Sequence, residues 1–306
     1  MNKEEVIKNI YNKIHKHKIL FLLLLIFMFI GIEFISYKFD RGNSFFVRLA
    51  NRYYFEPSLE KTKNFYIAYD TPLETDEFVM LLGLWPELAN DKELVFTSDP
   101  FYRTYKDSWQ VDDMKIVRRA KTKEELKTFL RLFGIDAPVY DIGDKYNKTM
   151  TDFTDNVVVK ALYCDKSGYD DFDYKLLNLI RDNNGGYGDT HFLMSILFLE
   201  KLDCLDKEVL NKDKKSVLEN IIKTQKEDEV FSDLFAERVV VLYWAGEGSS
   251  VKFPWILKIA KNIKSDGGWR DVGSYESNPH VTGLSALAIK YFINDDFVNN
   301  IWFASE

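Results

Sequence analysis

The chain of 306 residues has only two cysteines, Cys164 and Cys204. That number excludes the dense disulfide framework that holds small secreted scaffolds together, and it leaves the redox compartment open. Both cysteines lie in helical patterns, so we expect buried thiols rather than a cross-link.

An excess of positive charge is also missing. The formal net charge is −7, since 48 acidic residues outnumber 41 Lys and Arg. Phosphate binding needs a clustered basic surface, so we expect no nucleic-acid partner. The sequence further lacks the G-x-S-x-G, H-E-x-x-H, Walker and dinucleotide-binding fingerprints. Alternating strand patterns are almost absent, and helical spacing predicts a mostly α domain of roughly ten helices.

One long apolar run lies near the N-terminus. Residues 19–32 carry no polar side chain, and the run continues past Glu33 to Tyr37. A helix of about 19 residues is ~28 Å long, close to the hydrocarbon thickness of a bilayer. The bulky residues that follow offer no small-residue cleavage site, which argues against a removed signal peptide. We therefore predict an uncleaved signal-anchor, a single transmembrane helix at residues 19–37 with the lipid bilayer as its partner.

The domain boundaries follow from this helix. We expect a basic flank at 1–18, the span at 19–37, a juxtamembrane linker at 38–60 and a helical domain at 61–306. Five lysines precede the span, whereas one lysine and three arginines follow it within residues 38–52. The positive-inside rule then favours a membrane protein with an extracytoplasmic C-terminal domain.

Two segments of that domain are related to one another. Residues 155–187 align without a gap to residues 237–269, and the identities are three valines, one serine and two glycines. In each copy a Gly-Gly-aromatic turn is followed by a histidine, His191 or His280, at the start of an apolar helical run. A fixed internal period indicates a repeat architecture in which no unit buries its apolar face alone. Residues 61–150 could hold a further copy that has lost the glycines.

The order of helix, turn, helix, Gly-Gly-aromatic turn and inner helix resembles the repeat of protein prenyltransferase β subunits and squalene/oxidosqualene cyclases. The resemblance covers about residues 150–295 and is carried by Gly267-Gly268-Trp269-Arg270 and by His280 to Ala288. It implies an all-α fold, an α/α-toroid in which outer helices surround inner helices that enclose a cavity.

The catalytic signatures of that family are missing from this chain. The D-x-D-D motif of the cyclases is absent, and Asp170, Asp171 and Asp173 suit a helix N-terminus instead. The D-x-C zinc spacing of the prenyltransferases is absent as well. We therefore predict no metal ligands and leave the cofactor unknown, with a zinc bridge of both histidines and a carboxylate as the alternative.

The two repeated histidines are the clearest functional candidates. We expect His191 and His280 near one end of the inner helices, with Asp189 and Asp271 as catalytic acid, base or metal-binding partners. The ligand-binding residues expected at the same rim are Tyr187, Trp269, Arg270 and Tyr275. The structural alternative is that each histidine only bonds to nearby backbone. Glu237, like Asp155 in the first copy, is expected to cap the helix that follows.

Three functions remain open at this point. The first is a membrane-anchored toroid domain that binds a lipid, isoprenoid or peptide ligand. The second is an active prenyltransferase-like or terpene cyclase-like enzyme that uses the histidines and carboxylates. The third is a non-catalytic assembly or interaction protein whose ring is filled.

Overall fold

The computed structural model describes residues 18–19, 21–32, 44–69, 80, 84, 157–183 and 185–294. This part of the chain is helical without any strand, as the sequence predicts. The chain divides into two compact units, Met1–Tyr54 and Phe55–Glu306. The possible additional repeat copy lies almost wholly outside the described residues.

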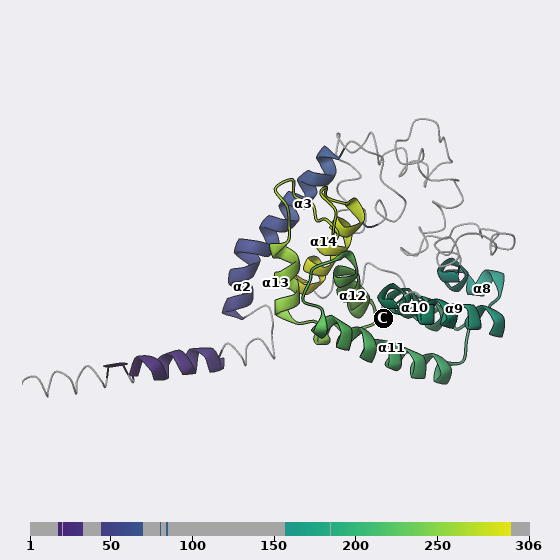
Figure 1. Cartoon of the computed structure of the whole chain (residues 1–306). Helices are drawn as coiled ribbons and strands as arrows, with labels where there is room; N and C mark the ends of the chain where they lie inside the picture. The colour runs from purple at the N-terminus through teal and green to yellow at the C-terminus, as the bar shows by residue number, and fades with distance from the viewer. Residues whose placement is uncertain are drawn as a thin grey trace, which may run out of the picture. The chain divides into compact units, whose positions relative to one another are not determined.

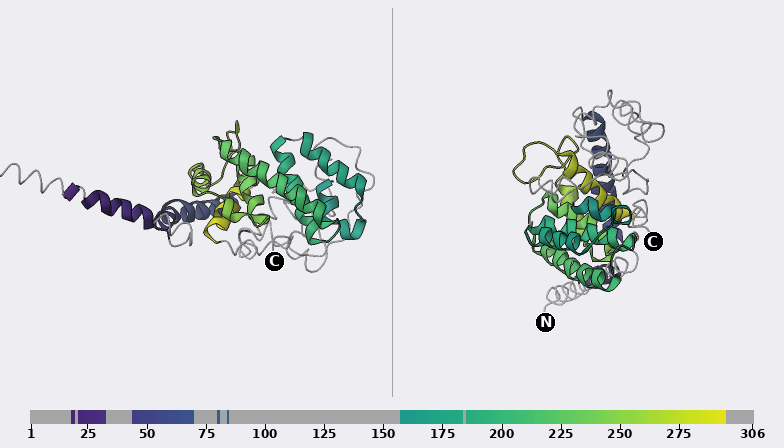
Figure 2. Two further views of the ribbon diagram at one scale, coloured as in Figure 1. Left: turned by 90° about the horizontal axis from the view of Figure 1, so that it is seen from below. Right: turned by 90° about the vertical axis from the view of Figure 1, so that its right-hand side faces the viewer.

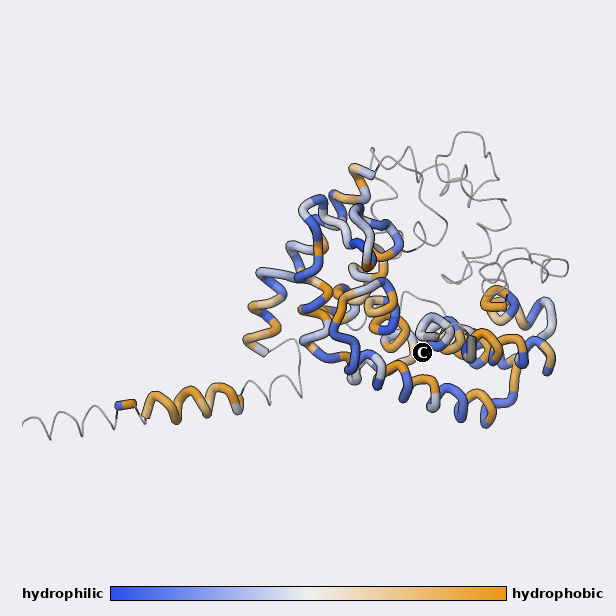
Figure 3. The backbone as a smooth tube through the Cα atoms, viewed as in Figure 1, coloured by the Kyte–Doolittle hydropathy of each residue, from blue (hydrophilic) through white to orange (hydrophobic). Residues whose placement is uncertain are grey.

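In the first unit, the apolar run is helical over residues 21–32. Each large apolar side chain of this helix is between 44% and 69% exposed, and Figure 3 shows hydrophobic residues along its whole length. Residues 33–37, which would complete the predicted span, lie outside the described residues. Among the helices that the structure describes, none combines the length and the apolar character needed to cross a membrane.

Three helical elements follow directly on one another. They are α2 (Phe45–Ala50), the π-helix η2 (Asn51–Phe55) and α3 (Glu56–Ala68). The boundary between the two units falls within η2. The segment expected to be a juxtamembrane linker is therefore helical from Phe45 onward.

The second unit packs its helices in two layers (Figure 1). The inner layer consists of α10 (Gly185–Lys201), α12 (Asp233–Trp244) and α14 (Pro279–Ile293). Along this layer α10 contacts α12, and α12 contacts α14. Nearly every residue of α12 and α14 is buried, which is typical of helices covered on all sides.

The outer helices are amphipathic and cover the inner layer. They are α9 (Asp171–Asn183), α11 (Lys207–Glu227) and α13 (Phe253–Lys261). Helices α9 and α11 contact α10, α11 also contacts α12, and α13 contacts α14; Figure 2 gives further views of this packing. The inner and outer layers match the predicted repeat of helical hairpins, and closure of the inner layer into a ring stays a prediction.

Local sequence fixes where the inner helices begin. The Ser232 hydroxyl accepts a hydrogen bond from the Phe235 N–H at 3.1 Å, which caps α12. The side chain of Asn278 caps α14 by accepting from the N–H groups of His280 and Val281. The predicted capping role of Glu237 is therefore wrong, because Glu237 lies more than one turn inside α12.

The two Gly-Gly segments adopt different conformations. Gly267 has φ +90° and forms the predicted turn, where a Cβ would collide with the backbone carbonyl of Lys61 in α3. The predicted turn in the first copy is wrong, since the helix α10 already begins at Gly185. Gly186 instead permits close packing, because a Cβ there would collide with Leu234 and Arg238. His191 consequently lies about two turns into its helix.

The cysteines form a disulfide between Cys164 and Cys204, with their Cα atoms 6.1 Å apart. The expectation of free buried thiols is wrong. Cys164 lies in the short helix α8 (Cys164–Ser167), just before α9, and Cys204 follows α10. Because α9 and α10 form a hairpin, the two ends of that hairpin meet and the cysteines come within bonding distance.

Candidate functional site

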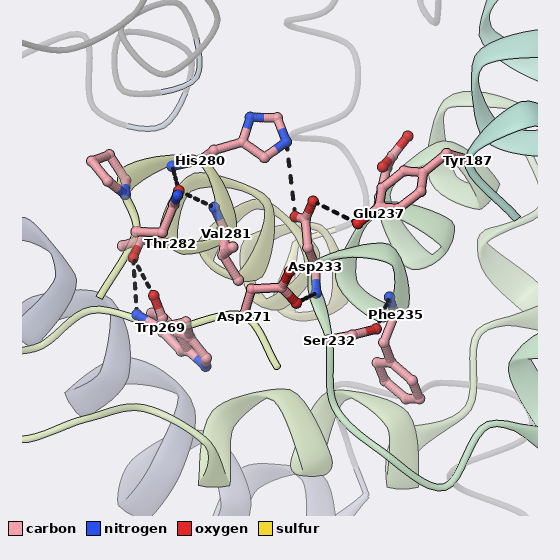
Figure 4. Close-up of polar contacts among 12 residues, drawn as sticks. Tyr187, Ser232, Asp233, Phe235, Glu237, Trp269, Asp271, His280, Val281 and Thr282 are labelled. Carbon is pink, nitrogen blue, oxygen red and sulfur yellow. Dashed lines mark hydrogen bonds and ion pairs between the residues drawn. The ribbon is translucent and has the colours of Figure 1, made fainter. Parts of the chain in front are cut away.

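A cluster of carboxylates and imidazoles joins the three inner helices, and Figure 4 shows its part around Asp233 and His280. Asp233 and Glu237 are four residues apart on α12 and therefore share one face, where each is 9% exposed. Nε2 of His280 on α14 lies 3.8 Å from Oδ1 of Asp233. Nδ1 of His191 on α10 lies 3.9 Å from Oε1 of Glu237. The two repeated histidines thus flank α12 from opposite neighbouring helices.

Tyr187 and Asp271 complete this cluster around Asp233. The Tyr187 hydroxyl donates to Oδ2 of Asp233 at 3.1 Å. The backbone N–H of Asp233 donates to Oδ1 of Asp271, also at 3.1 Å. A carboxylate at the first turn of α12 is favourable, because helix N-terminal N–H groups carry partial positive charge.

Burial raises the pKa of Asp233 from 3.8 to about 6. The positive charge of His280 and the hydrogen bond from Tyr187 oppose this shift, while the negative charges of Glu237 and Asp271 add to it. Burial and the neighbouring Asp233 charge also raise the pKa of Tyr187 above its ordinary value. Asp233 can therefore exchange a proton close to neutral pH, which an exposed aspartate cannot do.

Oδ1 of Asp233 is the least satisfied polar atom of the cluster. It is buried and accepts no hydrogen bond from any residue that the structure describes. Its 3.8 Å distance to His280 is too long for a direct hydrogen bond. A buried acceptor without a donor is costly, so a ligand N–H or O–H, or a bridging water, would gain most at this atom.

The orientation of His191 fixes which ring nitrogen carries the proton. Its Nδ1 lies 2.8 Å from the carbonyl oxygen of Tyr187. A carbonyl can only accept, so Nδ1 must be the donor, and Nε2 of the neutral ring is left as an acceptor. The side chain is 26% exposed, so this acceptor belongs to a partly accessible group.

The other candidates from the sequence lie apart from this cluster. The buried Asp189 carboxylate accepts from Arg181 of α9 at 3.3 Å and from Asn220 of α11 at 2.6 Å, so it ties the outer helices to α10. Trp269 is fully buried, and its indole N–H donates to the Ile259 carbonyl at 2.7 Å.

Arg270 and Tyr275 belong to the exposed loop before α14, and Tyr275 is 95% exposed. The structure thus brings His191, His280, Asp271 and Tyr187 together, and it places Asp189, Trp269, Arg270 and Tyr275 elsewhere. No three His, Cys, Asp or Glu side chains within the described part of the chain are arranged to hold a metal ion. The zinc alternative therefore has no ligand set there.

Sequence reasoning missed Asp233, which is central to the cluster. A signal for it was present: Asp233 and Glu237 are four residues apart in a segment that is otherwise almost wholly apolar. Two acids on one face of a buried helix must find partners, and the two repeated histidines were the available partners.

Comparison with known proteins adds no relative, since no family model, curated protein or solved structure matches the chain.

Proposed function

We propose that the chain is a membrane-anchored protein whose helical-hairpin domain lies on the extracytoplasmic side and binds a ligand at the carboxylate–imidazole cluster. The observation that carries the proposal is the buried Asp233–Glu237 face of α12, which both repeated histidines flank. Residues from three helices converge there, as expected of a binding site between helices of one layer.

The first unit supports anchoring in a membrane. Its helix at residues 21–32 exposes a continuous set of large apolar side chains. Removing each such side chain from water is worth about 1.5–3 kcal/mol, so lipid is a far better solvent for this helix than water. With residues 33–37 added, as the sequence predicts, the helix would be long enough to cross the hydrocarbon core of a bilayer.

The disulfide supports the extracytoplasmic side. Disulfides persist in oxidising compartments and are rare where thiol reductants are abundant. The Cys164–Cys204 bond therefore agrees with the orientation that the flanking lysines and arginines favour. Charge bias and redox chemistry are independent of one another, and they favour the same side.

The charges of the cluster favour a ligand that carries an amine or another hydrogen-bond donor. Asp233, Glu237 and Asp271 place three carboxylates close together, opposed by two imidazoles. Such a site attracts a cation and repels phosphate, because like charges in a partly buried site interact strongly. Among the ligands open from the sequence, a peptide therefore fits better than an isoprenoid diphosphate.

We further propose that the inner layer belongs to an α/α-toroid. Its support is the order of inner and outer helices and the small residues of α14, among them Gly283 and Ala286, which let helices pack closely. In a ring that is filled and inert, a buried acceptor such as Oδ1 of Asp233 would be expected to have a donor. Its lack of a donor therefore argues against the inert ring.

Catalysis is a second candidate function, and the raised pKa of Asp233 beside the two histidines favours it. Asp233 has a pKa near neutrality and can donate a proton. Nε2 of His191 is the acceptor in the tautomer whose Nδ1 donates to the Tyr187 carbonyl. An acid and a base on adjoining helices are the minimum for general acid–base chemistry on a bound ligand.

Binding is tested with the full chain in lipid nanodiscs and a fluorescent peptide that bears a free N-terminal amine and two lysines. We expect Glu237→Gln to weaken binding about tenfold, because it removes a charge that a buried cation would pair with. Glu219→Gln on the exposed face of α11 is the matched control and should have no effect. Equal affinity of all three proteins, or tighter binding of farnesyl diphosphate than of the peptide, would contradict the proposal.

A further inference from the structure

The exposed face of α2 and η2 is aromatic and cationic. Five large apolar side chains of this segment are between 41% and 61% exposed: Phe45, Phe46, Leu49, Tyr53 and Tyr54. Its charged side chains are Arg48 and Arg52, which are both exposed. Val47 and Ala50 are buried, so the helix has a covered side and its aromatic side is the outward one. A helix that faces water shows the opposite arrangement.

The character of the exposed face changes at the next helix. The exposed residues of α3 include Glu56, Glu60, Lys61 and Asn64, which are polar and carry charges of both signs. Residues 45–54 contain no acidic side chain at all. The exposed aromatic surface of α2 and η2 therefore does not continue onto α3.

This surface is continuous with the apolar helix within the first unit. The ring of Phe29 lies 5.7 Å from that of Phe45 and 6.2 Å from that of Phe46. Phe45 and Phe46 are themselves 5.8 Å apart in an edge-to-face arrangement. An exposed apolar helix and an exposed aromatic helix thus share one ring cluster.

We infer that residues 45–54 form a second lipid contact, a helix that lies in the interface of a bilayer with anionic headgroups. The inference rests on the membrane anchoring proposed above and adds to it. Aromatic rings collect at the boundary between headgroups and acyl chains, and arginine side chains reach from there to phosphates. Helices of this kind sink their apolar face ~5–10 Å into that boundary.

The charge of the segment selects a lipid surface over a protein surface. Two arginines without any acidic side chain in residues 45–54 are attracted by anionic lipid headgroups on the side of the membrane where the domain lies. A second copy of the chain would bring the same two arginines against each other, and like charges opposed in this way repel. Continuity with the helix at residues 21–32 gives the surface a direct connection to lipid.

The test compares Phe46→Trp with Asn64→Trp, each in the full chain reconstituted into phosphatidylcholine–phosphatidylglycerol vesicles. Both positions are exposed, and one lies in the aromatic surface whereas the other lies on α3. Half of the samples contain lipids that are brominated on the part of the acyl chain nearest the headgroup. Bromine quenches the fluorescence of nearby tryptophan. We expect the tryptophan added by Phe46→Trp to be quenched at least about twice as strongly as that added by Asn64→Trp, given the burial depth of interfacial helices.

A second comparison tests the cations. Adding Arg48→Gln and Arg52→Gln to Phe46→Trp should reduce the quenching in anionic vesicles to the level found in pure phosphatidylcholine. Unfolding curves of all variants in the same vesicles check that the domain stays folded.

Alkaline carbonate extraction separates this inference from the anchor. Equal quenching of both tryptophans in chains that resist extraction would overturn the interfacial helix and leave the anchor intact. Release of the chain by carbonate would overturn both. Quenching that is low but rises when each vesicle holds a single chain would show that two copies, and not lipid, cover this surface in the membrane, which also overturns the inference.

Discussion

The two copies of the repeat share a motif and differ in what that motif does. In the second copy Gly267 turns the chain against Lys61 of α3, and His280 is the second residue of its helix. In the first copy the glycines are helical, Gly186 packs against α12, and His191 lies inside α10. Identical short sequences thus take the conformation that their neighbours impose. Both copies nevertheless deliver one histidine to α12.

The largest expected difference between the copies is the effect of alanine at the glycines. Gly267→Ala should lower the free energy of unfolding by about 4 kcal/mol. Alanine is strained at the left-handed φ of this position, and its Cβ would collide with the backbone carbonyl of Lys61. Gly186→Ala should cost only about 1 kcal/mol, since the atoms in its way belong to the movable ends of Leu234 and Arg238. Chemical unfolding of the two variants measures both values.

Gly246→Ala serves as a control for the left-handed backbone alone. Its φ is +78° and nothing lies near its absent Cβ, so it reports strain without a collision. If Gly186→Ala were as costly as Gly267→Ala, the assignment of different roles to the two Gly-Gly segments would be wrong.

Reduction of the disulfide should affect the first copy alone. The bond closes a separation of 40 residues around α9 and α10. Its loss should therefore lower the free energy of local opening of the α9–α10 hairpin by about 3 kcal/mol, because the opened segment is no longer held as a closed loop. Hydrogen exchange followed with and without reductant should accelerate in α9 and α10 and remain unchanged in α14. Uniform acceleration throughout the domain would argue against separate hairpins.

The smallest expected effect concerns the proton on Asp233. Its pKa is higher in the folded protein than the ordinary value of 3.8, so the folded state binds the proton more tightly. The free energy of unfolding should therefore fall as pH rises from about 4 to about 6, by roughly 2 kcal/mol, and stay low above that range.

Asp233→Asn should remove most of this pH dependence and stabilise the domain above pH 6, because it places no charge in the buried site. Glu219→Gln, on an exposed part of α11, should leave the dependence as it is. Urea unfolding at a series of pH values measures the slope, and an unchanged slope in Asp233→Asn would exclude this residue as its source.

Most of the helices could be predicted from the sequence, because their ends carry local signals. The helix expected from Phe231 to Trp244 is Asp233–Trp244, and the one expected from His280 to Phe292 is Pro279–Ile293. Ser232, Asn278 and Pro279 supply these signals within a few residues. The state of the glycines at 185–186 could not be predicted, since it depends on α12, which lies some fifty residues further along the chain.

The site was predictable only in part, and the error has a geometric cause. With residues 185–190 taken as a turn, Asp189 and His191 could share a rim. In a helix, residues two apart point about 200° away from one another. Asp189 therefore faces Arg181 and Asn220, while His191 faces Glu237. The pairing of both histidines with α12 required the three-dimensional order of the inner layer.

Helix α12 contacts the histidines of both repeat segments. Asp233 and Glu237 lie on this one helix, so a small rotation of α12 about its axis changes the distances to both imidazoles together. Any molecule that draws one carboxylate toward itself thereby alters the surroundings of the other. Both histidines thus report on the position of one and the same helix.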